Sequence, residues 1–179
     1  MNTPNVTKWS IDKAHSEVQF KVKHLVIATV TGQFNDFDAT LETSGNDLTG
    51  AKAEFTASVD SISTNSTDRD NHLKSVDFFD AANHPEIRFV STKFDKTGED
   101  TYTMTGNLTI RGTTKEVTLN VEAGGIIVDP WGNTKAGFEI TGRINRFDYG
   151  LHWNSVTEAG GLVVGPEIKL ALNVEMTKI

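Results

Sequence analysis

Three polar side chains near the N-terminus are of the types that form a hydrolytic triad. Asp12, His15 and Ser16 lie close together in a short turn that precedes a predicted strand. The members of a triad must converge in space, and a catalytic serine often stands on a sharp Gly-x-Ser-x-Gly turn. The chain has no such segment. We therefore expect no hydrolytic triad, and we expect that the protein is not an enzyme.

Metal and cofactor chemistry have little support in the sequence. The histidines, at positions 15, 24, 72, 84 and 152, include no His-x-x-x-His pair that would place two metal ligands on one helix face. The chain has no cysteine, which excludes disulfides, thiolate zinc sites and iron–sulfur clusters. It also has no glycine-rich nucleotide loop. No metal and no cofactor are therefore predicted.

Two polar positions are better suited to contact the head group of a ligand. His24 shares the two-residue parity of Phe20 and Val22, so it should point inward near a strand end. Arg69 and His72 lie three residues apart in a predicted helix and share one face. Each position also has a plainer interpretation: a buried histidine bonded to a backbone carbonyl, and a solvated, charge-paired helix surface.

The elements that must position these side chains are strands, because apolar and polar residues alternate along most of the chain. The parity of one strand shifts near Asn35-Asp36, as a β-bulge would cause. One apolar and one polar face per strand is typical of antiparallel sheets, and closing the sheet buries the apolar face. The sequence predicts an all-β, eight-stranded antiparallel, lipocalin-like barrel with strands over 18–24, 32–42, 51–59, 86–94, 102–110, 117–123, 136–144 and 168–176.

One segment departs from this alternation. Residues 65–82 are predicted to form a short amphipathic helix between the third and fourth strands, with Ser66 or Thr67 as N-cap. Leu73, Val76 and Phe79 recur at helical spacing and should form its apolar side. The helix would lie over one mouth or one flank of the barrel.

Composition places the chain among ordinary folded proteins. Its 179 residues, 37% of them hydrophobic, suit a single domain over 1–179. The formal net charge of −7 argues against a nucleic-acid partner. No apolar run approaches the length of a membrane helix, so stable membrane insertion is not expected. The N-terminus lacks a signal-peptide pattern, which predicts a cytoplasmic protein, or a periplasmic one if a leader has been removed.

The interior of such a barrel can be filled or can hold one small ligand. Many inward positions are small, among them Ala39, Ala53, Gly106 and Gly142, beside ten phenylalanines in the whole chain. Tapered packing explains this pattern, and so does room for an elongated apolar molecule. An interior with few polar groups would suit a long hydrocarbon chain better than a sugar or a nucleotide.

Short motifs spread over residues 9–177 resemble those of the YceI family of polyisoprenoid-binding, lipocalin-like proteins. They include Trp9-Ser-Ile-Asp12, His15-Ser-Glu-Val18-Gln-Phe20, Asp60-Ser-Ile-Ser-Thr64, Arg69-Asp70-Asn-His72, His84-Pro85, Gly106-Asn-Leu108-Thr-Ile110-Arg111-Gly112-Thr-Thr-Lys115 and Asn145-Arg146-Phe147-Asp148-Tyr149-Gly150. Each motif is weak alone, but their order and spacing are specific.

The resemblance implies a long apolar pocket that holds an isoprenoid, an isoprenoid quinone or a fatty acyl derivative. It implies a carrier in isoprenoid quinone metabolism, transport or stress response, with a homodimer as a further expectation. Strand parity then predicts the lining of the pocket, with His24 and Arg69 at the head group. The lining residues are Phe20, Val22, Phe34, Phe55, Val59, Phe89, Leu108, Ile110, Phe138 and Ile144, with Phe78 and Phe79 near the helix.

Two other classes of function stay open on the sequence. A barrel with a filled core would act as a protein-interaction module and would not take up an apolar dye. A lipid-modifying enzyme would need a polar cluster at the barrel mouth, and its turnover would depend on His24 or His72.

Overall fold

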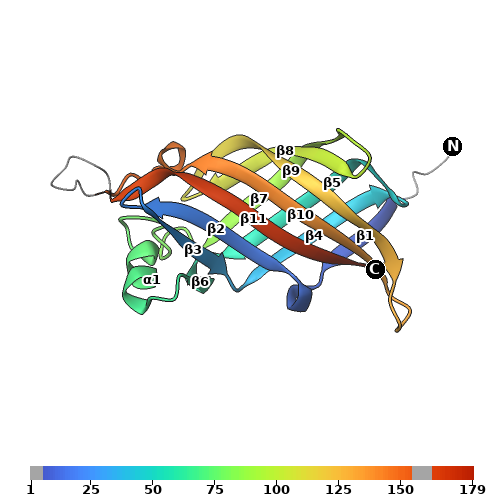
Figure 1. Ribbon diagram of the computed structural model, residues 1–179, viewed down its shortest axis with the longest axis horizontal. Helices are drawn as coiled ribbons and strands as arrows, with labels where there is room; N and C mark the ends of the chain where they lie inside the picture. The colour runs from blue at the N-terminus through green and yellow to red at the C-terminus, as the bar shows by residue number, and fades with distance from the viewer. Residues whose placement is uncertain (1–5, 155–162) are drawn as a thin grey trace.

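The computed structural model describes residues 6–154 and 163–179, which form a long barrel (Figure 1). Strands account for most of these residues. They are β1 (Val6–Ile11), β2 (Glu17–His24), β3 (Ala28–Phe34), β4 (Phe37–Ser44), β5 (Asp47–Ser58), β6 (Ile62–Ser63), β7 (Glu86–Lys96), β8 (Thr101–Ile110), β9 (Thr113–Val128), β10 (Thr134–Asn145) and β11 (Val164–Lys178).

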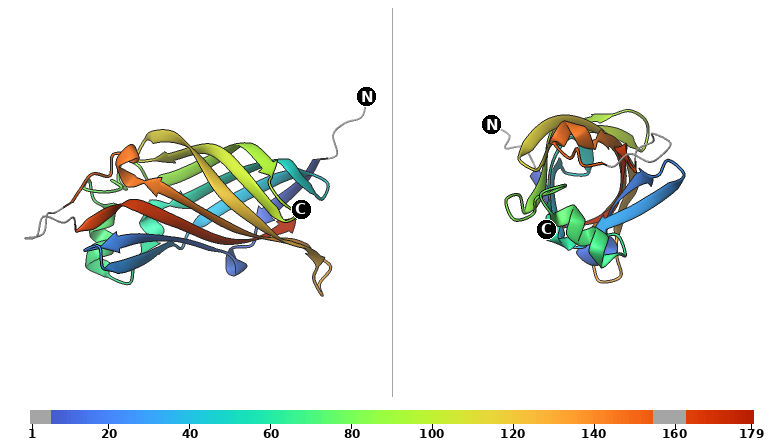
Figure 2. Two further views of the ribbon diagram at one scale, coloured as in Figure 1. Left: turned by 45° about the horizontal axis from the view of Figure 1, so that its top comes forward. Right: turned by 90° about the vertical axis from the view of Figure 1, so that its left-hand side faces the viewer.

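The sheet closes on itself in the order β1-β4-β5-β7-β8-β9-β10-β11, and every pairing is antiparallel. The closing contact joins the two ends of the chain, where Trp9 of β1 pairs with Lys178 of β11. The predicted eight-stranded antiparallel barrel is therefore confirmed, and the view along its axis shows the closed ring (Figure 2).

Two of the eight strands are interrupted. The first consists of β1 and β2, separated by the 3-10 turn η1 (Lys13–His15), which the Asp12 side chain caps at the Ala14 amide. The second consists of β3 and β4, separated at Asn35-Asp36, where the sequence predicted a bulge. Because of these breaks, β11 pairs with β1 at one end of the barrel and with β2 at the other.

The sequence analysis did not predict β1. Only Trp9 and Ile11 stand out in this segment as large apolar residues at alternate positions, which is too few for a clear alternation. Trp9 is nevertheless 1% exposed, and its indole Nε1 donates a 3.0 Å hydrogen bond to Thr43 Oγ1 of β4. Long-range pairing, rather than local pattern, forms this strand.

The predicted helix is shorter than expected. The helix is α1 (Thr67–Lys74), and the chain continues after it as turns. Ser66 is the N-cap, and its hydroxyl accepts a hydrogen bond from the Arg69 amide. The Ser75 hydroxyl donates to the His72 carbonyl, a contact that competes with further helix. No residue of α1 is fully buried, and Val76, predicted on its apolar side, is 65% exposed. The aromatic anchors of the segment are Phe78 and Phe79, which follow α1.

Candidate functional site

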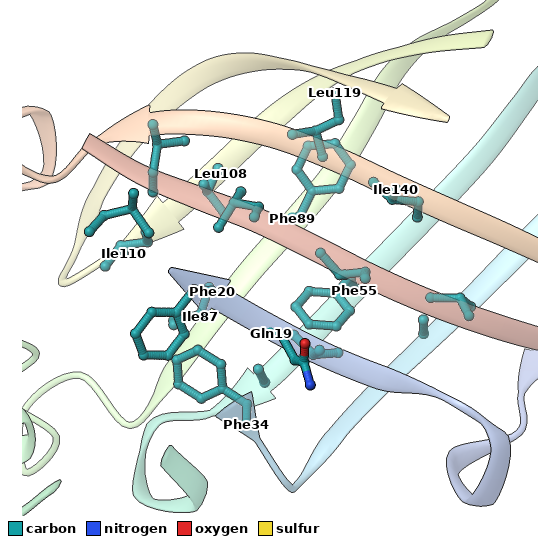
Figure 3. Close-up of a pocket in the computed structure, with 18 of the residues that line it drawn as sticks. Gln19, Phe20, Phe34, Phe55, Ile87, Phe89, Leu108, Ile110, Leu119 and Ile140 are labelled. Atoms are coloured by element: carbon teal, nitrogen blue, oxygen red, sulfur yellow. The ribbon is translucent and has the colours of Figure 1, made fainter. Parts of the chain in front are cut away.

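An apolar cavity of about 220 Å³ lies inside the barrel. It is lined by the inward faces of β2, β4, β5, β7, β8, β9, β10 and β11, and by residues of the α1 segment. Figure 3 shows inward side chains of several strands pointing into a common space. An empty cavity of 150 Å³ lined by similar side chains is known to admit benzene, so a space of this kind can hold an apolar molecule.

Most of the residues that strand parity assigned to the pocket line this cavity. They are Phe20, Val22, Phe34, Phe55, Phe78, Phe79, Phe89, Leu108, Ile110, Phe138 and Ile144. Phe20 and Phe34 contact each other at 5.6 Å between ring centroids, and Phe34 meets Phe79 edge-on at 6.1 Å. The α1 segment is thus joined to the β2–β3 side of the cavity by aromatic rings. That any of these residues binds a ligand stays a prediction.

Three of the predicted site residues lie outside the cavity lining. His24 is exposed at the end of β2, because the strand runs past the last cavity-lining residue, Val22. Val59 follows β5 in the 3-10 turn η2 (Val59–Ser61). It is buried there, but the alternation of the strand no longer applies to it, and it does not line the cavity. Parity assigns a face of a strand, but it does not say where the strand leaves the barrel or ends.

Arg69, the third of these residues, has a structural role. Its guanidinium donates to the side chain and the carbonyl oxygen of Thr64, through Nε at 2.7 Å to Oγ1 and through Nη2 to the carbonyl. The buried Thr64 in turn donates its amide and its hydroxyl to Asp70 Oδ1, at 2.8 and 2.6 Å. This network fastens the first turn of α1 to the end of β6. Arg69 therefore does not line the cavity, and its contact with a ligand head group stays a prediction.

His72, three residues after Arg69 in α1, also makes contacts within the protein. Its Nε2 lies 2.8 Å from Asp77 Oδ2. Its ring contacts Trp153 and Phe78 edge-on, at 4.7 and 5.1 Å between centroids. Since Phe78 lines the cavity, this cluster joins the segment after α1 to the 146–154 segment beside the cavity. Arg111 adds to the cluster by donating a 2.9 Å hydrogen bond to the Phe78 carbonyl.

Many lining residues were present in the alternation but were not assigned to the pocket. The strand β11 contributes more of them than any other strand. The additional apolar lining residues include Leu119, Val121, Ile140, Ile168, Leu170, Leu172, Val174 and Met176. Each has the parity of the buried face of its strand, so the signal was available in the sequence.

The small inward residues turn out to serve packing in part. A Cβ on Gly32 would lie 2.2 Å from the Phe20 ring, and one on Gly142 would lie 2.4 Å from Leu119. Large side chains therefore cover these glycines from the neighbouring strand. The cavity is the space left after this tapered packing.

Among the residues that the structure describes, four polar ones contribute to the cavity wall: Gln19, Thr40, Glu54 and Arg146. Along their strands Gln19 alternates with Phe20 and Glu54 alternates with Phe55, so these two belong to the outer parity. The Glu54 side chain is 59% exposed and faces Arg88 on the outer surface. The wall therefore offers hydrophobic contact and few directional groups.

Arg146, which the sequence analysis did not single out as a site residue, is a buried cation at the end of the barrel where α1 lies. It is 4% exposed and begins the 3-10 turn η3 (Arg146–Tyr149). Its guanidinium donates four hydrogen bonds to backbone carbonyls, at 2.7–3.1 Å. The acceptors are Leu151, Trp153, Val164 and Gly165. Burial lowers the pKa of Arg146 from its ordinary value. The residue ties the segment after β10 to the start of β11.

Tyr149, in the same turn, is 1% exposed. Its hydroxyl has no hydrogen-bond partner among the residues that the structure describes. Burial raises the pKa of Tyr149 to about 12, so the phenol stays neutral. It acts as part of the apolar packing at this end.

The Asp12, His15 and Ser16 group is not arranged as a triad. Asp12 Oδ2 lies 2.8 Å from His15 Nδ1, but the Ser16 hydroxyl is bonded to backbone, donating to the Asp12 carbonyl and accepting from the Glu175 amide. The ammonium of Lys135 lies 3.0 Å from Asp12 Oδ2 and 3.8 Å from Glu175 Oε1. Asp12, His15 and Glu175 are close enough to share an ion, yet the Lys135 cation already compensates their charge.

Comparison with known proteins agrees with this architecture. The YceI-like domain family matches residues 9–176 of the chain. The chain belongs to the YceI-like family. A UPF0312 protein of Staphylococcus epidermidis is 39% identical over 173 residues, which are 96% of this chain and 98% of the relative. No helix in the described part of this YceI-like chain is long and apolar enough to cross a membrane.

Solved structures show the same fold. A YceI protein of Campylobacter jejuni has a TM-score of 0.76 and 34% identity, with 94% of this chain and 96% of that chain covered. A polyisoprenoid-binding domain from Saccharophagus degradans has a TM-score of 0.69 and 16% identity, covering 96% of this YceI-like chain and 98% of the domain. The second likeness shows the fold alone.

Proposed function

We propose that this protein binds one long-chain apolar lipid inside its barrel. The lipid would be an isoprenoid, an isoprenoid quinone or a fatty acyl derivative. The observation that carries the proposal is the apolar cavity within the closed barrel, lined by aromatic and aliphatic side chains of nearly every long strand. Such a space suits a flexible hydrocarbon chain, whereas it offers few hydrogen-bonding partners to a polar solute.

The energetics of burial support this ligand class. Each CH₂ group that leaves water contributes about 0.8 kcal/mol, so a ten-carbon chain gains roughly 8 kcal/mol. Association costs at least about 4 kcal/mol in lost freedom, so longer chains bind more tightly than short ones. At the lowest of these costs, a tail of about fifteen carbons, which gains roughly 12 kcal/mol, would reach the free energy of micromolar binding, about 8 kcal/mol.

The family gives independent support. The Saccharophagus degradans domain that shares this fold is described as polyisoprenoid binding. Membership of the YceI-like family makes the same ligand class the first to test here. We infer a carrier that holds the lipid, in quinone metabolism, transport or a stress response, either as a single chain or as a homodimer.

The site favours binding over lipid modification. His24 and His72, the residues on which turnover was expected to depend in an enzyme, do not line the cavity. The cavity itself argues against the filled-core interaction module, because a filled barrel would leave no such space.

The test is native mass spectrometry of protein purified without detergent, followed by organic extraction and lipid analysis. We expect a stoichiometric adduct of a few hundred daltons that releases a prenyl or acyl lipid. A protein of bare mass that also fails to take up added isoprenoid quinone or fatty acid would contradict the proposal.

A further inference from the structure

We propose that the tip of the β2–β3 hairpin, Leu25-Val26-Ile27, docks this protein on an anionic lipid bilayer, so that the lipid passes between membrane and cavity. The inference rests on the proposed function and adds a surface to it. The docking is peripheral and reversible, because the tip is only three residues long.

The chemistry of the tip is unusual for a turn. Leu25, Val26 and Ile27 are 41%, 72% and 87% exposed. The backbone at Leu25 and Val26 is left-handed, with φ of 53° and 65°. Hairpin tips normally place Gly, Asn or Asp in this conformation, and a β-branched residue there is strained. Three exposed apolar side chains on a strained turn do not help the barrel to fold, so an apolar partner outside the protein explains them better.

The tip lies at the same end of the barrel as α1 (Figure 1). Val22 of β2, which lines the cavity, precedes Leu25 by three residues. His24 pairs with Val164, another lining residue, and the Leu25 amide donates to the Val163 carbonyl. A bilayer that receives the tip would therefore lie next to the apolar wall of the cavity.

The charges behind the tip suit anionic head groups. Lys21 and Lys23 are exposed on the outer face of β2, and Lys169 of β11 pairs directly with Lys21. At about 3.3 Å per residue, Lys23 and Lys21 lie roughly 7 and 13 Å from the tip, so Lys23 reaches the head-group layer of a docked bilayer and Lys21 lies just outside it. Arg143 of β10 pairs with Lys169 in register. The Nη1 atom of Arg143 lies 3.2 Å from Glu167 Oε1. This basic face stands out in a chain with a formal net charge of −7.

A second exposed apolar group lies at the opposite end of the barrel and serves as a control. Trp131 at the β9–β10 tip is 83% exposed, with Ile127 and Val128 at 65% and 68% (Figure 1). The Asp129 carboxylate holds that turn by accepting from the Trp131 and Asn133 amides. An acidic turn remote from the α1 end does not fit an anionic surface.

The experiment is vesicle co-sedimentation of the full chain. The vesicles are phosphatidylcholine alone or an equimolar mixture of phosphatidylcholine and phosphatidylglycerol. The wild type is expected to bind the anionic mixture and to release it at high salt. Combined Leu25→Asn, Val26→Gly and Ile27→Ser should weaken binding about tenfold or more. Combined Lys21→Gln, Lys23→Gln and Lys169→Gln should weaken it about fivefold per lysine.

Trp131→Ser is the matched control and should bind like the wild type. The tip variant places Asn and Gly, which tolerate positive φ, at Leu25 and Val26, and replaces Ile27, which is 87% exposed, so its Tm should not fall. Loss of binding with an unchanged Tm cannot be ascribed to unfolding. Equal binding by the tip variant and the wild type would overturn the inference, as would loss of binding in Trp131→Ser alone. Failure of the wild-type protein to bind either kind of vesicle would also overturn the inference, and would point to a protein partner for the tip.

The lipid content of the same samples separates the two proposals. Protein that carries extractable lipid but does not bind vesicles retains the proposed function and loses the docking inference. Protein that binds vesicles but neither carries nor takes up lipid retains the docking surface and loses the proposed function.

Discussion

The ring of Phe89 in β7 lies directly over Gly106 of β8. A Cβ at Gly106 would stand 2.5 Å from Phe89 Cζ and 2.5 Å from the carbonyl oxygen of Val90. The ring could rotate away, but the backbone carbonyl could not without breaking the β7–β8 ladder. A side chain at Gly106 would therefore displace Phe89, which lines the cavity.

Gly106→Ala is therefore expected to destabilise the fold by about 1–3 kcal/mol, the usual cost of overpacking a core. Gly137→Ala in β10 is the control, since in the described part of the chain no atom beyond its neighbours lies within 4 Å of its Cβ position and its φ is not left-handed. It should leave the stability unchanged or raise it slightly. Urea denaturation measures both. Equal effects of the two substitutions would contradict the packing account.

Arg146→Met should destabilise the barrel by at least about 3 kcal/mol. The substitution keeps an apolar side chain of similar length but leaves up to four carbonyls without their donor, each at about 1–3 kcal/mol if it stays buried. The control is Arg143→Met, which removes an exposed ion pair with Glu167 and should cost less than about 1 kcal/mol. Denaturation curves of the two variants should therefore be well separated, and coincident curves would show that the carbonyls are satisfied by water.

Phe55→Trp and Phe138→Trp should each lower lipid affinity, by about tenfold, because the larger ring takes space from the cavity. Glu139→Trp adds the same ring on the outer face of β10 and should leave affinity unchanged. Native mass spectrometry measures the fraction of each variant that carries lipid, under conditions in which all variants are equally folded. If both inward substitutions leave affinity intact, the pocket assignment is wrong.

Stability should depend on pH through Asp12. Its hydrogen bonds with His15 and Lys135 lower the pKa of the carboxyl to about 2, below the value near 4 of an unfolded chain. A lowered folded-state pKa gives a contribution that is full above the unfolded value and is lost as pH falls from about 4 towards 2. The urea midpoint of the wild type should approach that of Asp12→Asn over this range.

The contribution of His15 to stability changes with pH in the opposite direction. Asp12 raises the pKa of its imidazole through their hydrogen bond, so its contribution is full below about 6.5 and is lost as pH rises through the raised pKa. The advantage of the wild type over Asp12→Asn should thus be largest between about pH 4 and 6.5. Proton NMR of His15 should show its pKa fall in the variant. An unchanged His15 titration would show that the contact does not form in solution.

Alternation along the chain was sufficient to predict the barrel and much of its cavity wall. Parity follows from the two-residue repeat of a strand, which is a local property, so Phe20, Phe55, Phe89 and Phe138 could be assigned inward without any coordinates. The same local logic predicted an N-cap at Ser66 or Thr67, and the structure has it at Ser66.

The tertiary structure decided where these patterns stop. The ladder of β2 with β11 carries His24 beyond the cavity, the turn after β5 removes Val59 from it, and the Thr64 network holds Arg69 outside. The role of Arg146 depends on carbonyls from residues 151–165, brought together only when β10 and β11 pair. Sequence parity specifies the face of a side chain. Depth along the barrel and the partners of a buried charge depend on contacts between distant segments, and these exist only in the folded chain.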